Sequence, residues 1–284
     1  MRDGILAGDD YCERFFASEY RLDYLIHHYP KPLLAWGHGV VMGGGVGLLV
    51  GASHRVVTTS TRMAMPETSI GLYPDVGASV FLNRLPPGLG LFLGITGCEW
   101  NGADAVALGM ADYLLEDNAR AALPGQLVAT AWSGQPIEDR ILLDHLLRNL
   151  PAAAVSPQLT HHTALLAAAC RGSLAEAITA LPTLPIAEPW FTRALANLQH
   201  GCPVTACLVE QQLQRGRQLS LADAFRMEWI MSVQCCRHPD FPEGVRAQLV
   251  DKDKQPRWHF PAISAVPPAY IEAHFVQPVT KHPL

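Results

Sequence analysis

The chain has 284 residues, of which 49% are hydrophobic and 17% are charged, and its formal net charge is −5. This length is enough for one large domain or two modest ones with a substantial apolar core. The acidic surplus is spread along the chain without charged blocks, which argues against nucleic acid as a partner. The seven cysteines contain no CxxC pair and the first residues lack a long apolar segment, so the sequence predicts no disulfide framework, no zinc site and no secretory signal. We expect a reducing, cytoplasmic location.

Residues 33–53 form an almost uncharged apolar run that is long enough to span a bilayer, and four of its glycines repeat as GxxxG. Seven residues of this run are glycine, however, and each costs a helix about 1 kcal/mol relative to alanine. Pro30 and Pro32 come directly before the run, which favours an extended segment over the start of a helix. We therefore expect short elements of a soluble domain here and no membrane as a partner.

The first part of the chain, to about residue 120, alternates between helical and extended patterns. The first predicted helix covers residues 10–29. Its apolar residues, among them Tyr11, Phe15 and Leu22, fall on one face at the 3.6-residue period, which predicts an amphipathic helix. Glu19 lies at the edge of that face, where a carboxylate is ordinarily just solvated. Further helices are predicted at 46–52, 75–84, 88–96 and 103–108, and strands at 33–36, 55–59, 62–65 and 112–115.

From about residue 120 the chain is rich in alanine and leucine and has a helical period throughout. Ser173 and Glu176 fit a capping box, and Ser220 is a suitable N-cap. We expect an α/β core over residues 1–120 and an all-helical region over residues 121–284. The predicted helices of this second region cover 135–149, 158–170, 173–181, 187–199, 204–215, 220–237 and 242–250.

A glycine turn, Met42–Gly47 with the sequence MGGGVG, follows a predicted strand and precedes a predicted helix. Consecutive glycines allow backbone conformations that side chains forbid, and the N–H groups at a helix N-terminus favour negative charge. The turn could hold a phosphate or the oxyanion of a reacting carbonyl group, and a tight packing turn is an equally good interpretation. Neither the lysine of a P-loop nor the acidic residue of a dinucleotide site follows it.

Two carboxylates in apolar surroundings each follow a proline, Glu67 in MPET and Asp75 in YPDVG. A carboxyl group held in an apolar pocket has a raised pKa, which suits general acid–base catalysis. Two such groups in one pocket could divide the roles of base or nucleophile and of acid or orienting group. The alternative interpretation is that both are turn or cap residues, with Asp75 as the N-cap of the predicted helix 75–84.

Several segments, in order along the chain, resemble the crotonase (enoyl-CoA hydratase/isomerase) superfamily and, within it, the 3-hydroxyisobutyryl-CoA hydrolase branch. The resemblance extends over nearly the whole chain. It implies a spiral of ββα turns followed by a helical C-terminal part, in an acyl-CoA enzyme that needs no cofactor, since coenzyme A is part of the substrate. The matching segments are Met42–Gly47, Ala64–Thr68, Gly71–Gly77, Asp240–Arg246 and Asp251–Trp258.

The resemblance also implies roles for individual residues. Gly44 matches a donor of the oxyanion hole, Glu67 the catalytic glutamate and Asp75 the second acid of the branch. Glu19 matches a glutamate that contacts the substrate. The family's hydratases carry a further glutamate in the glycine turn, where this chain has Gly47. The resemblance therefore favours hydrolysis of a short 3-hydroxyacyl-CoA thioester, as in valine catabolism, over hydration of an enoyl-CoA.

Members of the family begin with several strands and an Ala-Gly-Gly-Asp segment that this sequence does not contain. By resemblance, the N-terminal part of the family's domain is therefore expected to be absent. This keeps open a non-catalytic acyl-CoA binder on a crotonase fold, beside a hydrolase and a hydratase. The expected partner is a small-molecule acyl-CoA, whereas assembly into a homo-oligomer is open. Also open is whether Glu67 attacks the thioester carbonyl or activates a water molecule.

Overall fold

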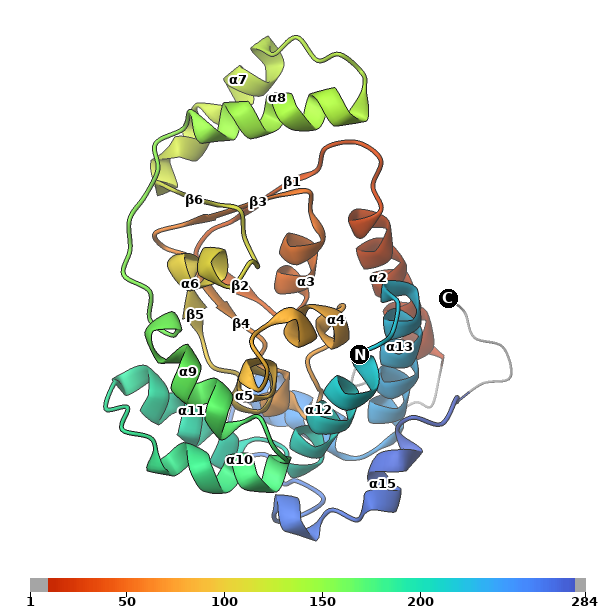
Figure 1. The fold of residues 1–284 in the computed structure, drawn as a ribbon. Coiled ribbons are helices and arrows are strands. Elements are labelled where there is room, and N and C mark those ends of the chain that lie inside the picture. Colours follow the sequence, from red (N-terminus) through yellow and green to blue (C-terminus); the bar gives the residue numbers. More distant parts are fainter. Residues whose placement is uncertain (1–9, 279–284) are drawn as a thin grey trace. The chain divides into compact units, whose positions relative to one another are not determined.

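The structure is a computed structural model and describes residues 10–278 (Figure 1). The described residues divide into two compact units, each assembled from segments that are separated in the sequence. The first unit contains residues 10–22, 65–98 and 162–278, and the second contains residues 23–64 and 99–161. Helices that follow residue 121 contribute to both units. The sequence boundary expected at residue 120 stays a prediction.

The strands of the described residues form two small three-stranded sheets, both in the second unit. The first sheet is parallel, in the order β1 (Leu34–Gly37), β3 (His54–Thr58) and β6 (Tyr113–Leu115). The second sheet is mixed, with β2 (Val40–Met42) parallel to β4 (Arg62–Ala64) and β4 antiparallel to β5 (Trp100–Asn101).

A hydrophobic core packs against the first sheet. Val56 of β3 and Leu115 of β6 belong to this core, and so do Leu143 and Leu147, which lie one turn apart on α8. Figure 1 shows α8 lying along this sheet, with α7 beside it. An amphipathic helix thus covers the sheet, whose residues in this core are Val56, Tyr113 and Leu115. The helices that lie wholly within the second unit are α3 (Gly44–Gly51), α6 (Gly102–Ala107), α7 (Leu123–Ala129) and α8 (Pro136–Arg148).

The apolar run of residues 33–53 is divided among β1, β2 and α3. Within the described part of the chain, no helix has both the length and the apolar character that crossing a membrane requires. The prediction that this run forms short elements, rather than one long helix, is confirmed.

The first unit is built from helices around α5 (Leu89–Thr96), all of whose residues are buried. A helix that is apolar on every side has to be covered on every side. Here the covering helices include α9, α11 and α12. The helices of this unit are α2 (Tyr11–His27, to Leu22), α4 (Ala78–Phe81), α9 (Thr163–Ala169), α10 (Leu174–Ala180), α11 (Pro189–His200), α12 (Pro203–Gly216), α13 (Leu221–Arg237), α14 (Asp240–Val245) and α15 (Pro268–Ala273).

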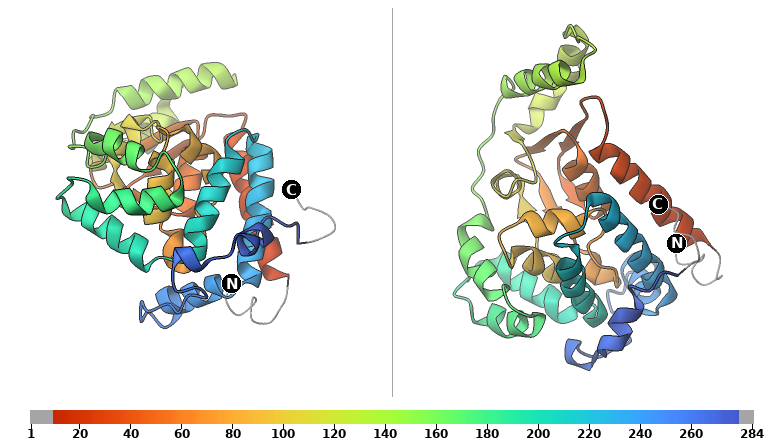
Figure 2. Two further views of the ribbon diagram at one scale, coloured as in Figure 1. Left: turned by 60° about the horizontal axis from the view of Figure 1, so that its bottom comes forward. Right: turned by 45° about the vertical axis from the view of Figure 1, so that its right-hand side comes forward.

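The N-terminal part of α2 lies beside α13 (Figures 1 and 2). The Trp229 indole N–H donates to the carbonyl of Glu13 at 3.0 Å, and the rings of Tyr20 and Phe225 have centroids 5.8 Å apart. These contacts join two helices that are separated by about two hundred residues of sequence.

The buried face of α2 differs from the face that its periodicity predicts. Phe15 and Leu22 are 37% and 50% exposed, whereas Phe16 and Tyr20 are buried. Two stripes that contain aromatic residues run along this helix, and periodicity alone does not show which of them meets α13. The stripe that is buried brings Tyr20 and the adjacent Glu19 toward the interior of the first unit.

The predicted helix caps of the C-terminal region are confirmed. Ser173 and Glu176 form a reciprocal capping box at the start of α10. The hydroxyl of Ser220 accepts a hydrogen bond from the Asp223 N–H at the start of α13. Each cap satisfies a backbone donor that a helix terminus otherwise leaves without a partner.

The predicted helix at residues 75–84 begins only at Ala78. Gly77 is its N-cap, with φ at 89°, and the chain before it forms a loop. The alternative interpretation of Asp75 as the N-cap of this helix is therefore wrong. Its side chain instead accepts a hydrogen bond from the hydroxyl of Tyr20.

Candidate active site

Three carboxylates that the sequence singles out lie in the first unit. Glu19 is in α2, Glu67 is the first residue of a 3₁₀ helix, η1 (Glu67–Ile70), and Asp75 is in the loop before α4. The charge of Asp75 raises the pKa of both Glu19 and Glu67. Segments that are well separated in the sequence thus form one carboxylate cluster, made of Glu19, Glu67 and Asp75.

Glu67 is held in the interior with one oxygen unused. Its side chain is 5% exposed, and Oε2 has no hydrogen-bond partner among residues 10–278. Burial, and then the charges of Asp75 and Glu19, raise the pKa of this carboxyl well above its usual value. Its backbone is fixed, because its carbonyl accepts the Leu72 N–H at 3.1 Å. A fixed acceptor oxygen without a protein partner is suited to bind water or substrate.

Asp75 is equally buried but has a hydrogen-bond partner. Its side chain is 5% exposed, and the hydroxyl of Tyr20 donates to Oδ2 at 2.7 Å. Burial raises the pKa of Asp75 to about 6, and the hydrogen bond from Tyr20 opposes this rise. Two buried carboxyls in one cluster thus differ in their hydrogen bonding, which allows them to take different roles.

The backbone after Asp75 is strained. Val76 has φ at 52°, in the left-handed region that a β-branched residue rarely adopts. The buried Glu228 of α13 holds this turn, because its two oxygens accept the N–H groups of Gly77 at 2.8 Å and of Ser79 at 2.9 Å. Such strain persists only where the surrounding structure imposes it, and it is concentrated at functional sites.

Glu19 lies at the margin of the cluster. Its side chain is half-buried on α2. Burial, followed by the charge of Asp75, raises the pKa of Glu19 to about 7. A carboxyl group with this exposure can meet a ligand that enters from solvent.

The glycine turn lies in the second unit. Gly43 has φ at 55° and ψ at −124°, a conformation that is essentially restricted to glycine. Helix α3 begins at Gly44, so the Gly44 N–H belongs to the first turn, where an N–H has no acceptor within the helix. Gly47 is buried, and the first turn of α3 contains no acidic residue. That the Gly44 N–H contributes to an oxyanion hole stays a prediction.

The structure brings Glu19, Glu67 and Asp75 together, whereas Gly44 belongs to the other unit. Among the described residues, no group of three or more histidine, cysteine, aspartate or glutamate side chains is arranged to hold a metal ion. The buried carboxyl groups of the carboxylate cluster are suited to acid–base or nucleophilic catalysis.

Sequence reasoning missed four buried polar residues that contact Asp75, its loop or one another. A weak signal was available, because Glu228 and Ser232 are four residues apart and so share one face of a predicted helix. A glutamate on a buried face usually has a specific partner. The missed residues are Tyr20, Tyr73, Glu228 and Ser232.

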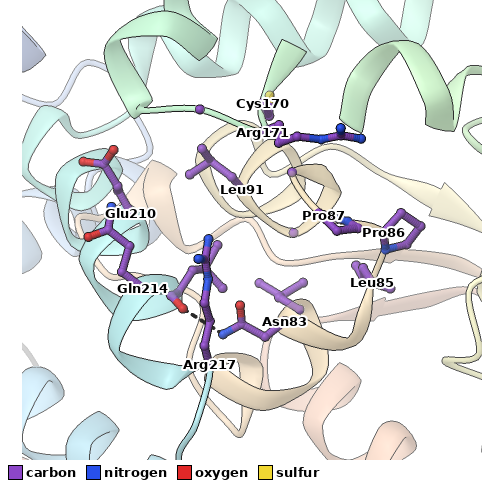
Figure 3. Close-up of a pocket in the computed structure, with 15 residues that line it drawn as sticks. Asn83, Leu85, Pro86, Pro87, Leu91, Cys170, Arg171, Glu210, Gln214 and Arg217 are labelled. Atoms are coloured by element: carbon purple, nitrogen blue, oxygen red, sulfur yellow. Dashed lines mark hydrogen bonds between the residues drawn. The ribbon is translucent and has the colours of Figure 1, made fainter. Parts of the chain in front are cut away.

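A separate pocket of the first unit, about 390 Å³ in volume, is not lined by the carboxylate cluster (Figure 3). Asn83 and the exposed Arg171 and Arg217 contribute to its wall. The carboxylate of Glu210, also in the wall, accepts the Leu174 N–H at 2.6 Å at the start of α10. The carboxylate of this pocket is thus engaged by the backbone, so we place the candidate active site at the carboxylate cluster, which contains buried carboxyls.

A reaction that uses the ionised cluster should slow as the pH falls through about 7 to about 6. Burial raises the pKa of Glu19 to about 7, that of Asp75 to about 6 and that of Glu67 well above its usual value, and only the ionised forms accept a proton. Measurement of kcat/KM between about pH 3 and about pH 9 checks this. An acid limb centred near 4, as for exposed carboxyls, would show that these groups are not the ones that titrate.

The enoyl-CoA hydratase/isomerase family model matches residues 1–275. The chain is similar to the mitochondrial 3-hydroxyisobutyryl-CoA hydrolase of Gallus gallus, with 36% identity over 276 residues that make up 97% of this chain and 71% of that protein. It is also similar to the 3-hydroxyisobutyryl-CoA hydrolase 1 of Arabidopsis thaliana, with 32% identity over 272 residues, 92% of this chain and 70% of that protein.

Two solved structures resemble the chain over nearly its whole length. An enoyl-CoA hydratase from Rhodobacter sphaeroides 2.4.1 matches with a TM-score of 0.83 and 30% identity, covering 98% of this chain and 78% of that one. A carnitinyl-CoA dehydratase from Mycobacterium thermoresistibile matches with a TM-score of 0.85 and 31% identity, covering 100% of this chain and 78% of that one. The expected α/β crotonase-like fold with a helical C-terminal part is confirmed. The chain belongs to the enoyl-CoA hydratase/isomerase (crotonase) family.

Proposed function

We propose that this chain, an acyl-CoA enzyme of the crotonase family, hydrolyses the thioester of 3-hydroxyisobutyryl-CoA, as in valine catabolism. The observation that carries the proposal is the buried pair Glu67 and Asp75, both with raised pKa and with Glu67 Oε2 lacking a partner among residues 10–278. The similarity to proteins named 3-hydroxyisobutyryl-CoA hydrolase supports the choice of substrate.

In the proposed reaction, Glu67 acts on the thioester carbonyl in one of two ways. It either accepts a proton from a water molecule that attacks the carbonyl carbon, or it attacks that carbon itself and water then hydrolyses the resulting anhydride. In both cases the carbon–sulfur bond breaks and one water molecule is consumed. The products are the free acid and the thiol of coenzyme A. The Gly44 N–H would stabilise the oxyanion that forms on the carbonyl oxygen.

Asp75 and Glu19 take the remaining roles in this proposal. An ionised Asp75 accepts a hydrogen bond from the 3-hydroxyl group of the substrate or passes on a proton. Glu19, half-buried at the margin of the cluster, contacts the substrate. The strained turn that Glu228 holds fixes the position from which Asp75 acts.

Two other functions compete with hydrolysis. Hydration of an enoyl-CoA is opposed by Gly47, because no carboxylate stands in the first turn of α3 to activate water together with Glu67. A non-catalytic acyl-CoA binder would have no use for buried carboxyls whose raised pKa costs the folded state stability at neutral pH. The cluster therefore favours an enzyme.

Thiol release from 3-hydroxyisobutyryl-CoA should clearly exceed the uncatalysed background. A thiol reagent follows this reaction, and the absorbance of the conjugated double bond of crotonyl-CoA follows hydration in a parallel assay. We expect thiol release in the first assay and no loss of absorbance in the second. Hydration without thiol release would make the chain a hydratase, and coenzyme A binding with neither reaction would make it a binder.

A cytoplasmic location is also proposed. It is supported by the absence of a disulfide among the seven cysteines, all of which lie in the described part of the chain. Assembly into a homo-oligomer stays a prediction.

A further inference from the structure

A chain of buried hydroxyl groups ends on Asp75. The Tyr20 hydroxyl donates to Asp75 Oδ2 at 2.7 Å and lies 2.6 Å from the Ser232 hydroxyl. The Ser232 hydroxyl lies 2.8 Å from that of Tyr73, which donates to the carbonyl of Glu228 at 2.5 Å. The side chains of Tyr20, Ser232 and Tyr73 are fully buried, and we call these three residues the hydroxyl relay.

The protons of the hydroxyl relay can be assigned by counting. The Tyr73 proton is committed to the Glu228 carbonyl, which is only an acceptor. When Asp75 is ionised, Tyr20 donates its proton to the carboxylate, and Ser232 is free to donate to Tyr20. When Asp75 is protonated and donates to Tyr20, the Tyr20 proton turns to Ser232 and the Ser232 proton to Tyr73. When Asp75 is protonated, four protons fill the four contacts of this chain, whereas with ionised Asp75 the three hydroxyl protons leave the Ser232–Tyr73 contact unfilled. The Tyr20 hydroxyl keeps a hydrogen bond to Asp75 in both states.

Within residues 10–278, no positively charged side chain contributes to the pKa of Asp75. Several titratable groups face it. They come from α2, from η1, from the loop of Asp75 itself and from α13. In the described part of the chain, Tyr20 is the one side chain that donates a hydrogen bond to Asp75. The titratable groups that face Asp75 are Glu19, Tyr20, Glu67, Tyr73, Glu228 and Cys235.

We propose that Tyr20 is a positioning residue that fixes the Asp75 carboxylate and keeps it ionised for the reaction, with Ser232 orienting the Tyr20 hydroxyl. The inference rests on the proposed function, in which an ionised Asp75 serves the substrate. A hydrogen bond to a charged acceptor is about twice as strong as one to a neutral acceptor, so Tyr20 stabilises the ionised form selectively. In agreement, the hydrogen bond from Tyr20 lowers the pKa of Asp75 against the larger effect of burial.

Tyr20→Phe removes the hydroxyl and keeps the buried ring. We expect the acid limb of the kcat/KM profile to move upward by about one to two pH units, because Asp75 loses a hydrogen bond to its charged form. The rate lost near pH 6 should therefore be largely recovered at higher pH. A purely structural role of Tyr20 would lower the rate by the same factor at every pH.

Tyr73→Phe is the matched control for this experiment. It makes the same change in an equally buried ring, at the end of the hydroxyl relay that has no hydrogen bond to Asp75. Its acid limb should coincide with that of the wild type. An unshifted limb in Tyr20→Phe, or an equal shift in both variants, would overturn the proposal.

Two further measurements keep the outcome decisive. If Tyr20→Phe does not fold, Ser232→Ala should shift the limb in the same direction by a smaller amount, and no shift would contradict the role of the hydroxyl relay. Titration of carbon-13 labelled aspartate side chains, with Asp75→Asn to assign the signal, follows Asp75 without any assay of activity. If the wild type releases no thiol, the proposed function fails, whereas the titration midpoint of Asp75 in Tyr20→Phe still decides the positioning role.

Discussion

Replacement of Glu67 by glutamine should reduce thioester hydrolysis by about 10² to 10⁴-fold or more, while coenzyme A binding is retained. Glutamine has nearly the shape of glutamate, but it accepts no proton at neutral pH and is not a nucleophile. Both roles that are open for Glu67 are therefore removed together. The loss should appear in kcat for thiol release from 3-hydroxyisobutyryl-CoA, and calorimetry with coenzyme A should show an unchanged affinity.

The same variant should be at least as stable as the wild type at about pH 8. Burial and neighbouring charges raise the pKa of Glu67, so the folded state binds its proton more tightly than the unfolded state. This carboxyl therefore lowers stability progressively as the pH rises above its usual value of 4.5, and glutamine removes the effect. Thermal unfolding checks this. The exposed Glu138→Gln in the first turn of α8 is a matched control that should leave turnover unchanged and lower stability by at most about 1 kcal/mol, through loss of a favourable charge at the helix N-terminus. Near-normal turnover in Glu67→Gln would contradict the catalytic assignment.

Replacement of Gly71 by alanine should reduce the free energy of unfolding by about 3 kcal/mol or more. Gly71 has φ at 73°, where an alanine is strained, and a Cβ atom built on it would lie 2.5 Å from the carbonyl oxygen of Asp240. No real Cβ approaches a backbone oxygen so closely, so η1 and α14 would have to separate. Urea unfolding of the variant and the wild type measures the loss.

Gly109→Ala separates the two causes of that loss. Gly109 has nearly the same backbone angle, φ at 72°, but a Cβ atom there would meet nothing within 4 Å. Gly109→Ala should lower the free energy of unfolding only by the conformational strain, about 1 to 2 kcal/mol. Equal losses in the two variants would show that the close approach of Gly71 to Asp240 contributes nothing.

The close approach of Gly71 to Asp240 joins two segments that are far apart in the sequence, Gly71–Gly77 and Asp240–Arg246. Gly71 opens the loop that carries Asp75, and Asp240 opens α14. In the reverse direction, a Cβ atom on Gly244 of α14 would lie 2.3 Å from the backbone of Ile70. The backbones of η1 and α14 thus meet through two glycines, and the C-terminal motif supports the loop of Asp75.

Much of the fold could be predicted from the sequence, because most helices carry their own signals. The capping box of Ser173 and the N-cap of Ser220 lie where the pattern puts them. Strand β2 could not be predicted because it lies between glycines in a uniformly apolar run that shows no alternation, and β5 has only two residues, too few to show a period. The buried face of α2 was predicted wrongly for another reason. The contact with α13, far along the chain, decides which of the two apolar faces of α2 is buried.

The candidate site could be predicted only as far as its chemistry is local. Glu67 and Asp75 were recognisable because each is a carboxylate that follows a proline in an apolar segment. The resemblance to the family also singled out Glu19, because it matches a glutamate that contacts the substrate. The hydroxyl relay was not recognisable, because Tyr20 and Ser232 are 212 residues apart and an isolated tyrosine or serine in a helix indicates no partner. Only the packing of α2 against α13 brings them to Asp75.

Thiol release measured in water enriched in oxygen-18 tests most directly whether the carboxylate cluster brings water to the thioester carbonyl. With 3-hydroxyisobutyryl-CoA as substrate, mass spectrometry locates the label after many turnovers. We expect label in the carboxylate of the released acid, in step with thiol release, and none at the 3-hydroxyl group. Glu67→Gln should give neither label nor thiol release. Label at the 3-hydroxyl group of an intact coenzyme A ester, without thiol release, would show reversible hydration and contradict the account.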